Sequence, residues 1–197
     1  MKTLRSLLIT ILAPLVAMAA PVLTFEPPSG ALSGAPGEVV GWGFSLSNPD
    51  ANYLVVAAAQ FCTTVNVGGS PVCDQLPPAS LGTFTDHIAQ FNFVVVGPSP
   101  ESNLVSQAFD ETLLTGIGSF GINPLAVPGQ SFGGQILLTY DLYSRSPNDP
   151  LFDPGADFLS SGNALTAPAS VNAVPEPSTL LLAAAGLLAL LLRRHSQ

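Results

Sequence analysis

Two glycine-containing motifs have residue types that could perform chemistry. Residues 129–133 read Gly-Gln-Ser-Phe-Gly, the G-x-S-x-G pattern that presents a nucleophilic serine in hydrolases. That pattern needs a helix after the serine and an acid and a histidine later in the chain. Here a strand-like pattern follows, and the downstream histidine is His195, beyond an apolar segment. We therefore interpret residues 129–133 as a turn that enters a strand.

Residues 116–121, Gly-Ile-Gly-Ser-Phe-Gly, match the G-x-G-x-x-G pattern of dinucleotide-binding loops. Such a loop opens a helix whose N-terminus meets the pyrophosphate. Pro124 and Pro128 leave no room for a helix of useful length. We therefore do not assign a cofactor to this segment.

Histidine and aspartate residues are the remaining candidates for base or metal-ligand chemistry. His87, next to Asp86, could act in either way, but nothing else in the sequence completes a site, and we expect a surface loop residue. Asp149, Asp153 and Asp157 recur every four residues and offer the hard oxygens that calcium prefers. Their spacing differs from the EF-hand loop, so we expect a solvated acidic turn and keep a calcium-stabilised loop as the alternative. We predict no catalytic residue, no cofactor and no defined metal site, and we do not expect an enzyme.

Charge is distributed unevenly along the chain. The 197 residues hold five Lys and Arg and thirteen Asp and Glu, for a net charge of −8. Four of the cations lie near the termini, so residues 20–174 keep Arg145 alone against twelve carboxylates, a net charge of −11. Binding to nucleic acid or to an anionic membrane surface needs cationic patches, so this charge argues against both classes of function for the exported region.

The first 19 residues have the order of a secretory signal peptide. Lys2 and Arg5 form a basic start, residues 6–16 are mostly apolar, and Ala17-Met18-Ala19 fits the A-x-A cleavage pattern. We predict cleavage after Ala19 and export of the residues that follow. Two cysteines, Cys62 and Cys73, lie in this exported region, where an oxidising compartment favours a disulfide. The Gly68-Gly69 pair between them predicts a disulfide-clipped hairpin.

The C-terminal residues 174–197 combine a polar motif, an apolar segment and a basic end. We expect a single membrane helix over residues 178–192, shorter than the roughly 20 residues of a typical span and suited to temporary anchoring. Arg193 and Arg194 would hold its end in the cytoplasm. Prolines in the preceding motif keep the backbone extended, a form that a membrane protease can bind. The motif consists of Val174, Pro175, Glu176 and Pro177.

This motif, the Leu/Ala segment and the terminal Arg-Arg pair resemble the PEP-CTERM sorting signal. The resemblance implies an exported protein of a Gram-negative bacterium that exosortase, a membrane cysteine protease, recognises and cleaves. It further implies removal of the helix and release to the cell surface or extracellular matrix, in the context of exopolysaccharide production. A similar tail also occurs on some ice-binding proteins, but this chain lacks the regular Thr-rich arrays that ice binding would need.

The exported region has the period-two pattern of strands. Val40, Trp42, Phe44 and Leu46 alternate with small residues, and Gly and Pro punctuate the chain at short intervals. The predicted strand segments are residues 40–46, 53–61, 91–95 and 136–142, with weaker candidates at 104–108 and 113–122. We predict an antiparallel β-sandwich over residues 20–161, resembling immunoglobulin-like modules, and a flexible spacer over residues 162–173.

Two functions remain open for the exported domain. The first is a non-enzymatic structural or interaction role at the cell surface or in an exopolysaccharide matrix. The alternative is a carbohydrate- or surface-binding module, assisted by calcium, with exposed aromatic residues beside an acidic groove. Tyr140 and Tyr143 are candidates for that exposure, whereas Trp42 is expected in the core.

Overall fold

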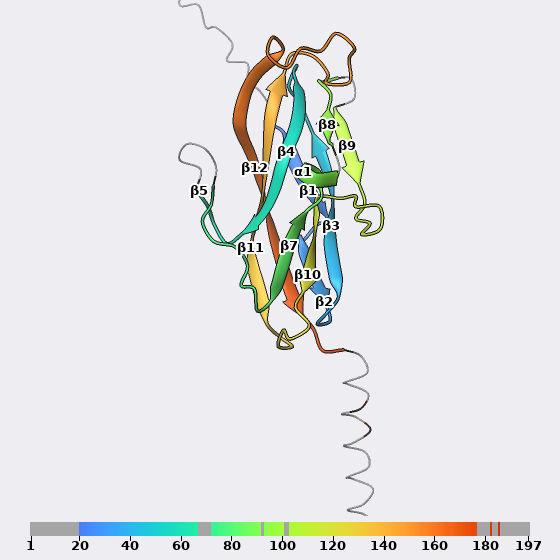
Figure 1. Cartoon of the computed structure of the whole chain (residues 1–197), viewed down its shortest axis with the longest axis vertical. Coiled ribbons are helices and arrows are strands. Elements are labelled where there is room, and N and C mark those ends of the chain that lie inside the picture. Colours follow the sequence, from blue (N-terminus) through green and yellow to red (C-terminus); the bar gives the residue numbers. More distant parts are fainter. Residues whose placement is uncertain are drawn as a thin grey trace, which may run out of the picture.

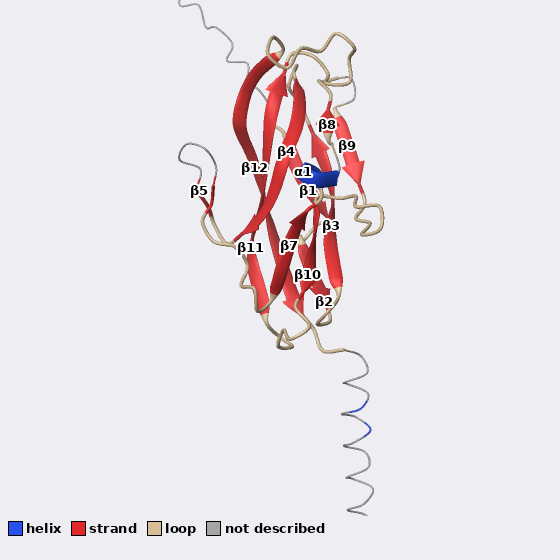
Figure 2. Cartoon of the chain, in the orientation of Figure 1, coloured by secondary structure: helices blue, strands red, loops and turns tan. Residues whose placement is uncertain are grey.

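The computed structural model describes residues 20–66, 72–91, 93–100, 103–176, 182 and 185. Within these residues the fold is all-β, with two five-stranded sheets, a small two-stranded hairpin and the one-turn helix α1 (Ile88–Phe91) (Figure 2). The prediction of an all-β domain is confirmed. Figure 1 shows the two sheets stacked face to face along the long axis of the domain, with the hairpin at β5 projecting from one side.

The first sheet is organised around a long central strand. Its members are β1 (Val22–Glu26), β3 (Val39–Ser47), β7 (Gly82–Asp86), β9 (Leu104–Gln107) and β10 (Gly118–Ile122). One edge of β3 pairs with β1, and the other pairs with β9 and then β10, both antiparallel. β9 and β10 therefore form one interrupted strand. Residues 108–117, the excursion loop, leave the sheet at this interruption, opposite Gly43.

The second sheet contains the longest strands of the molecule. Its order is β2 (Ala31–Gly34), β12 (Phe158–Ala173), β11 (Ser131–Tyr143), β4 (Tyr53–Cys62) and β8 (Val95–Val96). β11 and β12 form an antiparallel hairpin, and β2 pairs with β12 in parallel. The separate hairpin consists of β5 (Val65–Asn66) and β6 (Val72–Cys73).

Aromatic rings from both sheets fill the core between them. Trp42 on β3 and Phe61 on β4 are fully buried, with ring centroids 5.3 Å apart. Phe61 also meets Phe120 of β10 at 6.0 Å, in an edge-to-face contact that aromatic pairs favour. The Trp42 indole N–H donates to the carbonyl of Gly30 at 2.8 Å, which satisfies the one polar atom of this buried side chain. The predicted inward face of β3 is confirmed.

The prediction of a flexible spacer at residues 162–173 is wrong. This segment belongs to β12, which lies between β11 and β2 with both of its edges paired. Small residues at alternate positions turn inward and leave room for the large rings of the opposite strands. These inward residues are Ala167, Ala169, Val171 and Ala173.

The predicted strand at residues 91–95 is also corrected. Phe91 ends α1, and Phe91 and Phe93 are 54% and 64% exposed. The inward residues are Val94 and Val96, in the opposite phase to the prediction. The cause lies upstream, because Asp86 accepts hydrogen bonds from the N–H groups of Ile88 and Ala89. This capping starts a helical turn where the chain would otherwise extend.

The two predicted terminal helices lie outside this description. The signal peptide at residues 1–19 and nearly all of the helix at residues 178–192 fall beyond the described residues. Among the residues that are described, no helix has both the length and the apolar character needed to cross a membrane.

Candidate functional site

The predicted sorting motif begins directly after the last strand. Ala173, the final residue of β12, accepts a hydrogen bond from the Gly129 N–H at 2.7 Å and donates to the carbonyl of Gln130 at 2.9 Å. The N–H of Val174 donates to the carbonyl of Gly34 at 2.9 Å. The second sheet therefore fixes the backbone as far as the first residue of the motif.

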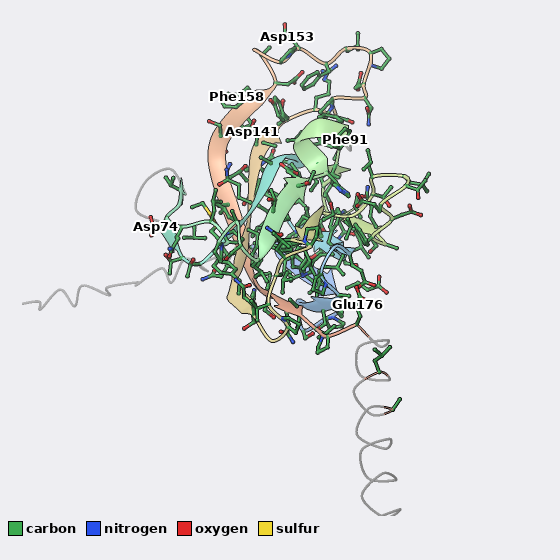
Figure 3. The ribbon with its side chains drawn as sticks, turned by 60° about the horizontal axis from the view of Figure 1, so that its bottom comes forward. Asp74, Phe91, Asp141, Asp153, Phe158 and Glu176 are labelled. Atoms are coloured by element: carbon green, nitrogen blue, oxygen red, sulfur yellow. A yellow bond between two sulfur atoms is a disulfide. The ribbon has the colours of Figure 1, made fainter. Side chains whose placement is uncertain are left out.

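The rest of the motif leaves the domain. Pro175 and Glu176 are exposed, and Figure 3 shows Glu176 at the opposite end of the molecule from Asp153. A following proline disfavours the helical region for Val174 and Glu176, so this stretch is an extended, accessible peptide. A protease cleft binds peptides in this form. Pro177, Arg193 and Arg194 lie outside the described residues.

The family model of the PEP-CTERM protein-sorting motif matches residues 173–194. The chain therefore carries a PEP-CTERM sorting signal. Such a signal indicates an exported protein that exosortase processes and that is sorted to the cell surface. The match begins at the last residue of β12, so the PEP-CTERM signal and the folded domain adjoin without an intervening linker.

No curated protein matches this chain. Among solved structures, the ASH/PapD-like domain of human CEP192 aligns over 89% of this chain and 99% of its own, with 10% identity and a TM-score of 0.37. SSP-19, an MSP-domain-like protein of Caenorhabditis elegans, aligns over 76% of this chain and 99% of its own, with 14% identity and a TM-score of 0.34.

Cys62 and Cys73 form a disulfide, as predicted. It closes the base of the β5–β6 hairpin, where Thr63 N–H also donates to the carbonyl of Gln75 at 2.9 Å. The disulfide ties the hairpin to β4 and so to the core, because Cys62 is fully buried. The Gly68-Gly69 turn predicted for its tip lies outside the described residues.

The expectation that His87 is a surface residue is wrong. Its side chain is fully buried and stacks on Phe109 of the excursion loop, with ring centroids 6.0 Å apart. Nδ1 lies 3.2 Å from the carbonyl oxygen of Thr115 and Nε2 lies 3.0 Å from Oγ of Ser119. Oε2 of Glu111 is 3.8 Å from Nε2. The four partners come from residues 109–119, which the sequence around His87 gives no means of anticipating.

The two glycine motifs form turns and strands, as interpreted from the sequence. Gly129 lies in a turn with a φ of +89°, and Ser131 begins β11, with no helix after it. In the second motif, Gly116 has a φ of +91° and residues 118–122 form β10. Neither segment has the helix that the corresponding catalytic or dinucleotide site requires.

The three aspartates of the predicted acidic turn do not converge on one point. Asp149 Oδ1 and Asp153 Oδ1 accept backbone N–H groups within the turn, and Asp157 accepts from Ser144 Oγ at 2.7 Å and from the N–H of Asp153 at 3.0 Å. Arg145 lies between them, 3.9 Å from Asp149 and 3.7 Å from Asp157. Throughout the described residues, no group of three or more His, Cys, Asp or Glu side chains is placed to hold a metal ion.

A groove between the two sheets was not anticipated from the sequence. It has a volume of about 530 Å³ and lies between β4 and β7, with Leu76 and Pro77 at its margin. Phe61 and Phe84 line it, and Asp86 closes one end by accepting the N–H of Ala59 at 2.9 Å. The sequence predicts β4 but not the strand that faces it, because Thr and Phe over residues 82–86 give a short and ambiguous pattern.

Backbone polar groups of both strands face this groove. Ala59 donates to Asp86, away from β11, so the alternation of an antiparallel strand directs the N–H of Phe61 to the same side. At the two ends of β7, Leu81 and His87 form backbone hydrogen bonds toward β10. Because the direction of these bonds alternates along an antiparallel strand, the N–H and carbonyl of Phe84 point the other way, toward the groove. The groove therefore combines apolar rings with two strand edges.

Proposed function

We propose that this protein is a non-enzymatic surface or matrix component, which exosortase releases from a temporary membrane anchor. The domain acts after release as a structural or interaction module. The observation that carries the proposal is the direct junction of β12 with the PEP-CTERM signal. A cut within the exposed motif removes the apolar tail and leaves the hydrogen bonds of the sandwich intact.

The released form can be tested by its C-terminus. We expect mass spectrometry of protein secreted by cells with exosortase to show a C-terminus within or just after the motif, with the Leu/Ala segment gone. Cells without exosortase should keep the full-length tail in the membrane fraction. Released protein with residue 197 still present would disprove the processing step.

The groove supports the interaction role. An extended segment of a partner protein can pair with the edge of β7 through backbone hydrogen bonds and place its side chains against the partly exposed Phe84. Among the residues that line the groove, Asp86 is the one with a charge, so an apolar partner segment is compatible with it.

A second candidate, carbohydrate binding, is supported by Phe91 and Phe93. Both rings are more than half exposed, and α1 begins two residues after Asp86 at the end of the groove. Tyr140 is buried, and Tyr143 packs against Phe152 and Phe158, so these tyrosines contribute less than the sequence suggested.

Hydrogen exchange separates the two candidates. A partner strand should slow exchange at the Phe84 amide and leave Thr63, which is already bonded to Gln75, unchanged. If the protein binds carbohydrate, it should bind to glycans fixed on an array, and Phe91→Ala and Phe93→Ala should abolish this binding. Leu104→Ala, which removes an exposed apolar side chain elsewhere, is the control. Repeating the array without calcium tests the calcium-assisted version. Absence of binding to every glycan would eliminate the second candidate.

A further inference from the structure

Two apolar side chains project from the end of the domain that carries the sorting motif. Leu125 is 88% exposed and Val127 is 67% exposed, whereas Ala126 between them is buried. They belong to the loop of residues 123–130, Asn-Pro-Leu-Ala-Val-Pro-Gly-Gln, which contains no charged residue. We call residues 123–130 the apical loop.

Hydrogen bonds hold the apical loop against the end of β12. Gly129 and Gln130 exchange backbone hydrogen bonds with Ala173, at 2.7 and 2.9 Å. The Asn123 side chain donates to the carbonyl of Ala79 and the Gln130 side chain donates to Ser80 Oγ, both at 3.0 Å. Because the loop is fixed and Ala126 occupies the inward position, Leu125 and Val127 have no inward alternative.

The length of chain between the sheet and the predicted helix places this loop near the membrane. Residues 175–177 separate the last sheet-bonded residue from the helix predicted at residue 178, and three extended residues span at most about 11 Å. The headgroup layer is roughly 5–8 Å deep on each side of the hydrocarbon core. Any anchored form must therefore hold the apical loop within or against the headgroups.

Four carboxylates lie at the opposite end, whereas Glu38, whose carbonyl accepts the N–H of Ile122, and Glu176 lie at the end of the apical loop. Asp50 follows the far end of β3, and the loop with Asp149, Asp153 and Asp157 follows the far end of β11. Figure 3 shows Asp153 at the end of the molecule opposite Glu176. β11 has thirteen residues, so that end is about 40 Å from the apical loop, well beyond the Debye length of about 8 Å. Carboxylates there do not feel repulsion from anionic headgroups.

We infer that the apical loop inserts Leu125 and Val127 into the headgroup region of the membrane that receives the C-terminal helix. The inference rests on the anchoring step of the proposed function and adds a second contact to it. The loop holds the domain upright on the lipid surface, with the sorting motif at the bilayer and the acidic end in solution. After cleavage two apolar side chains are too few to retain the domain, so it leaves.

A fluorescent label on a single added thiol tests the contact. The native cysteines are joined in a disulfide, so Leu125→Cys gives one reactive site in the full chain. The matched control is Leu151→Cys, which replaces a leucine that is 76% exposed at the acidic end. Each labelled protein is reconstituted into vesicles of phosphatidylethanolamine and phosphatidylglycerol and separated by flotation.

We expect the label at position 125 to show blue-shifted emission and to be quenched by nitroxide-bearing lipids, while the label at position 151 stays water-like. Protein that floats with a water-like label at position 125 would overturn the lipid contact and leave anchoring intact. Protein that does not float would overturn both. If the blue shift appears only when exosortase is present in the vesicles, the loop contacts the protease and not the lipid, and the inference is also overturned.

Discussion

The Nε2 atom of His87 lies 3.0 Å from the hydroxyl oxygen of Ser119. This distance is typical of a serine and its general base, but Ser119 is 3% exposed and His87 is fully buried, so a substrate cannot reach the hydroxyl. The pair instead joins the end of β7 to β10, and the Thr115 carbonyl on Nδ1 ties in the excursion loop. We interpret it as a structural link.

Ser119→Ala should therefore destabilise the domain. The substitution removes the partner of a buried ring nitrogen, for which the expected cost is about 1–3 kcal/mol. Ser106→Ala is the control, because its hydroxyl bonds Ser45 at the exposed surface, and surface changes stay within about 0.5 kcal/mol. Denaturant unfolding measures both, and equal losses would contradict the structural link.

Glu176→Ala should leave the protein uncleaved in the membrane fraction. Glu176 is an exposed residue of the motif and follows the last sheet-bonded residue by two positions, so its replacement alters recognition and not the fold. Fractionation and mass spectrometry of the C-terminus measure the effect. Glu26→Ala, an exposed glutamate on β1, should be processed like the wild type. Release of the Glu176→Ala protein with the same C-terminus as the wild type would show that exosortase does not need this carboxylate to recognise the motif.

Loss of the disulfide should weaken the domain without removing the fold. Closing a loop of this length contributes about 3 kcal/mol in the chain-entropy treatment, and the sandwich core does not include the hairpin. We expect the Cys62→Ala/Cys73→Ala variant to unfold at lower denaturant concentration and to be cut by proteases first between residues 63 and 75. The reduced wild type should behave in the same way, whereas a reducing agent should not affect the variant.

The acidic turn should make part of the stability depend on pH. The N–H of Asp153, the hydroxyl of Ser144 and the Arg145 guanidinium lower the pKa of Asp157. A lowered folded-state pKa contributes stability above the unfolded value of about 3.9, and this contribution is lost as the pH falls through the folded-state pKa. Asp157→Asn should thus lower the thermal midpoint at neutral pH, and its difference from the wild type should vanish in acid.

Ser144→Ala gives a direct check on that assignment. It removes one of the donors to Asp157 and should raise the carboxyl pKa toward its ordinary value, as followed by NMR titration. An unchanged pKa in this variant would mean that the hydroxyl does not contribute.

Strands with large residues on one face could be predicted from the sequence, and strands with small residues could not. Trp42, Phe44 and Leu46 alternate with Gly and Ser, so β3 has a clear phase. Alanines at positions 167, 169 and 173 alternate in the same way, but alanine is common in linkers and carries a weak burial signal. What holds β12 in place is its pairing with β2 and β11, which is not local in the sequence.

The candidate site divides along the same line. The sorting motif and the disulfide could be read from residue types and spacing, because their chemistry is local. The burial of His87 and the groove between β4 and β7 depend on segments that are distant in the sequence, such as Phe109 and Phe84. The alternation of Phe91 and Phe93 led to a wrong strand prediction for a related reason. The hydrogen bond from Ile88 to the Asp86 side chain starts a helical turn that includes Phe91.

The position of β12 has a consequence for the timing of export. An exported chain crosses the membrane from its N-terminus, so β2 emerges far ahead of the strand with which it pairs, and the second sheet stays incomplete until residues 170–173 have passed. The sorting signal follows at once. The second sheet therefore becomes complete at the same stage of export at which the sorting signal emerges. Because the signal comes last, exosortase cannot cleave the chain before every strand of the domain has crossed the membrane.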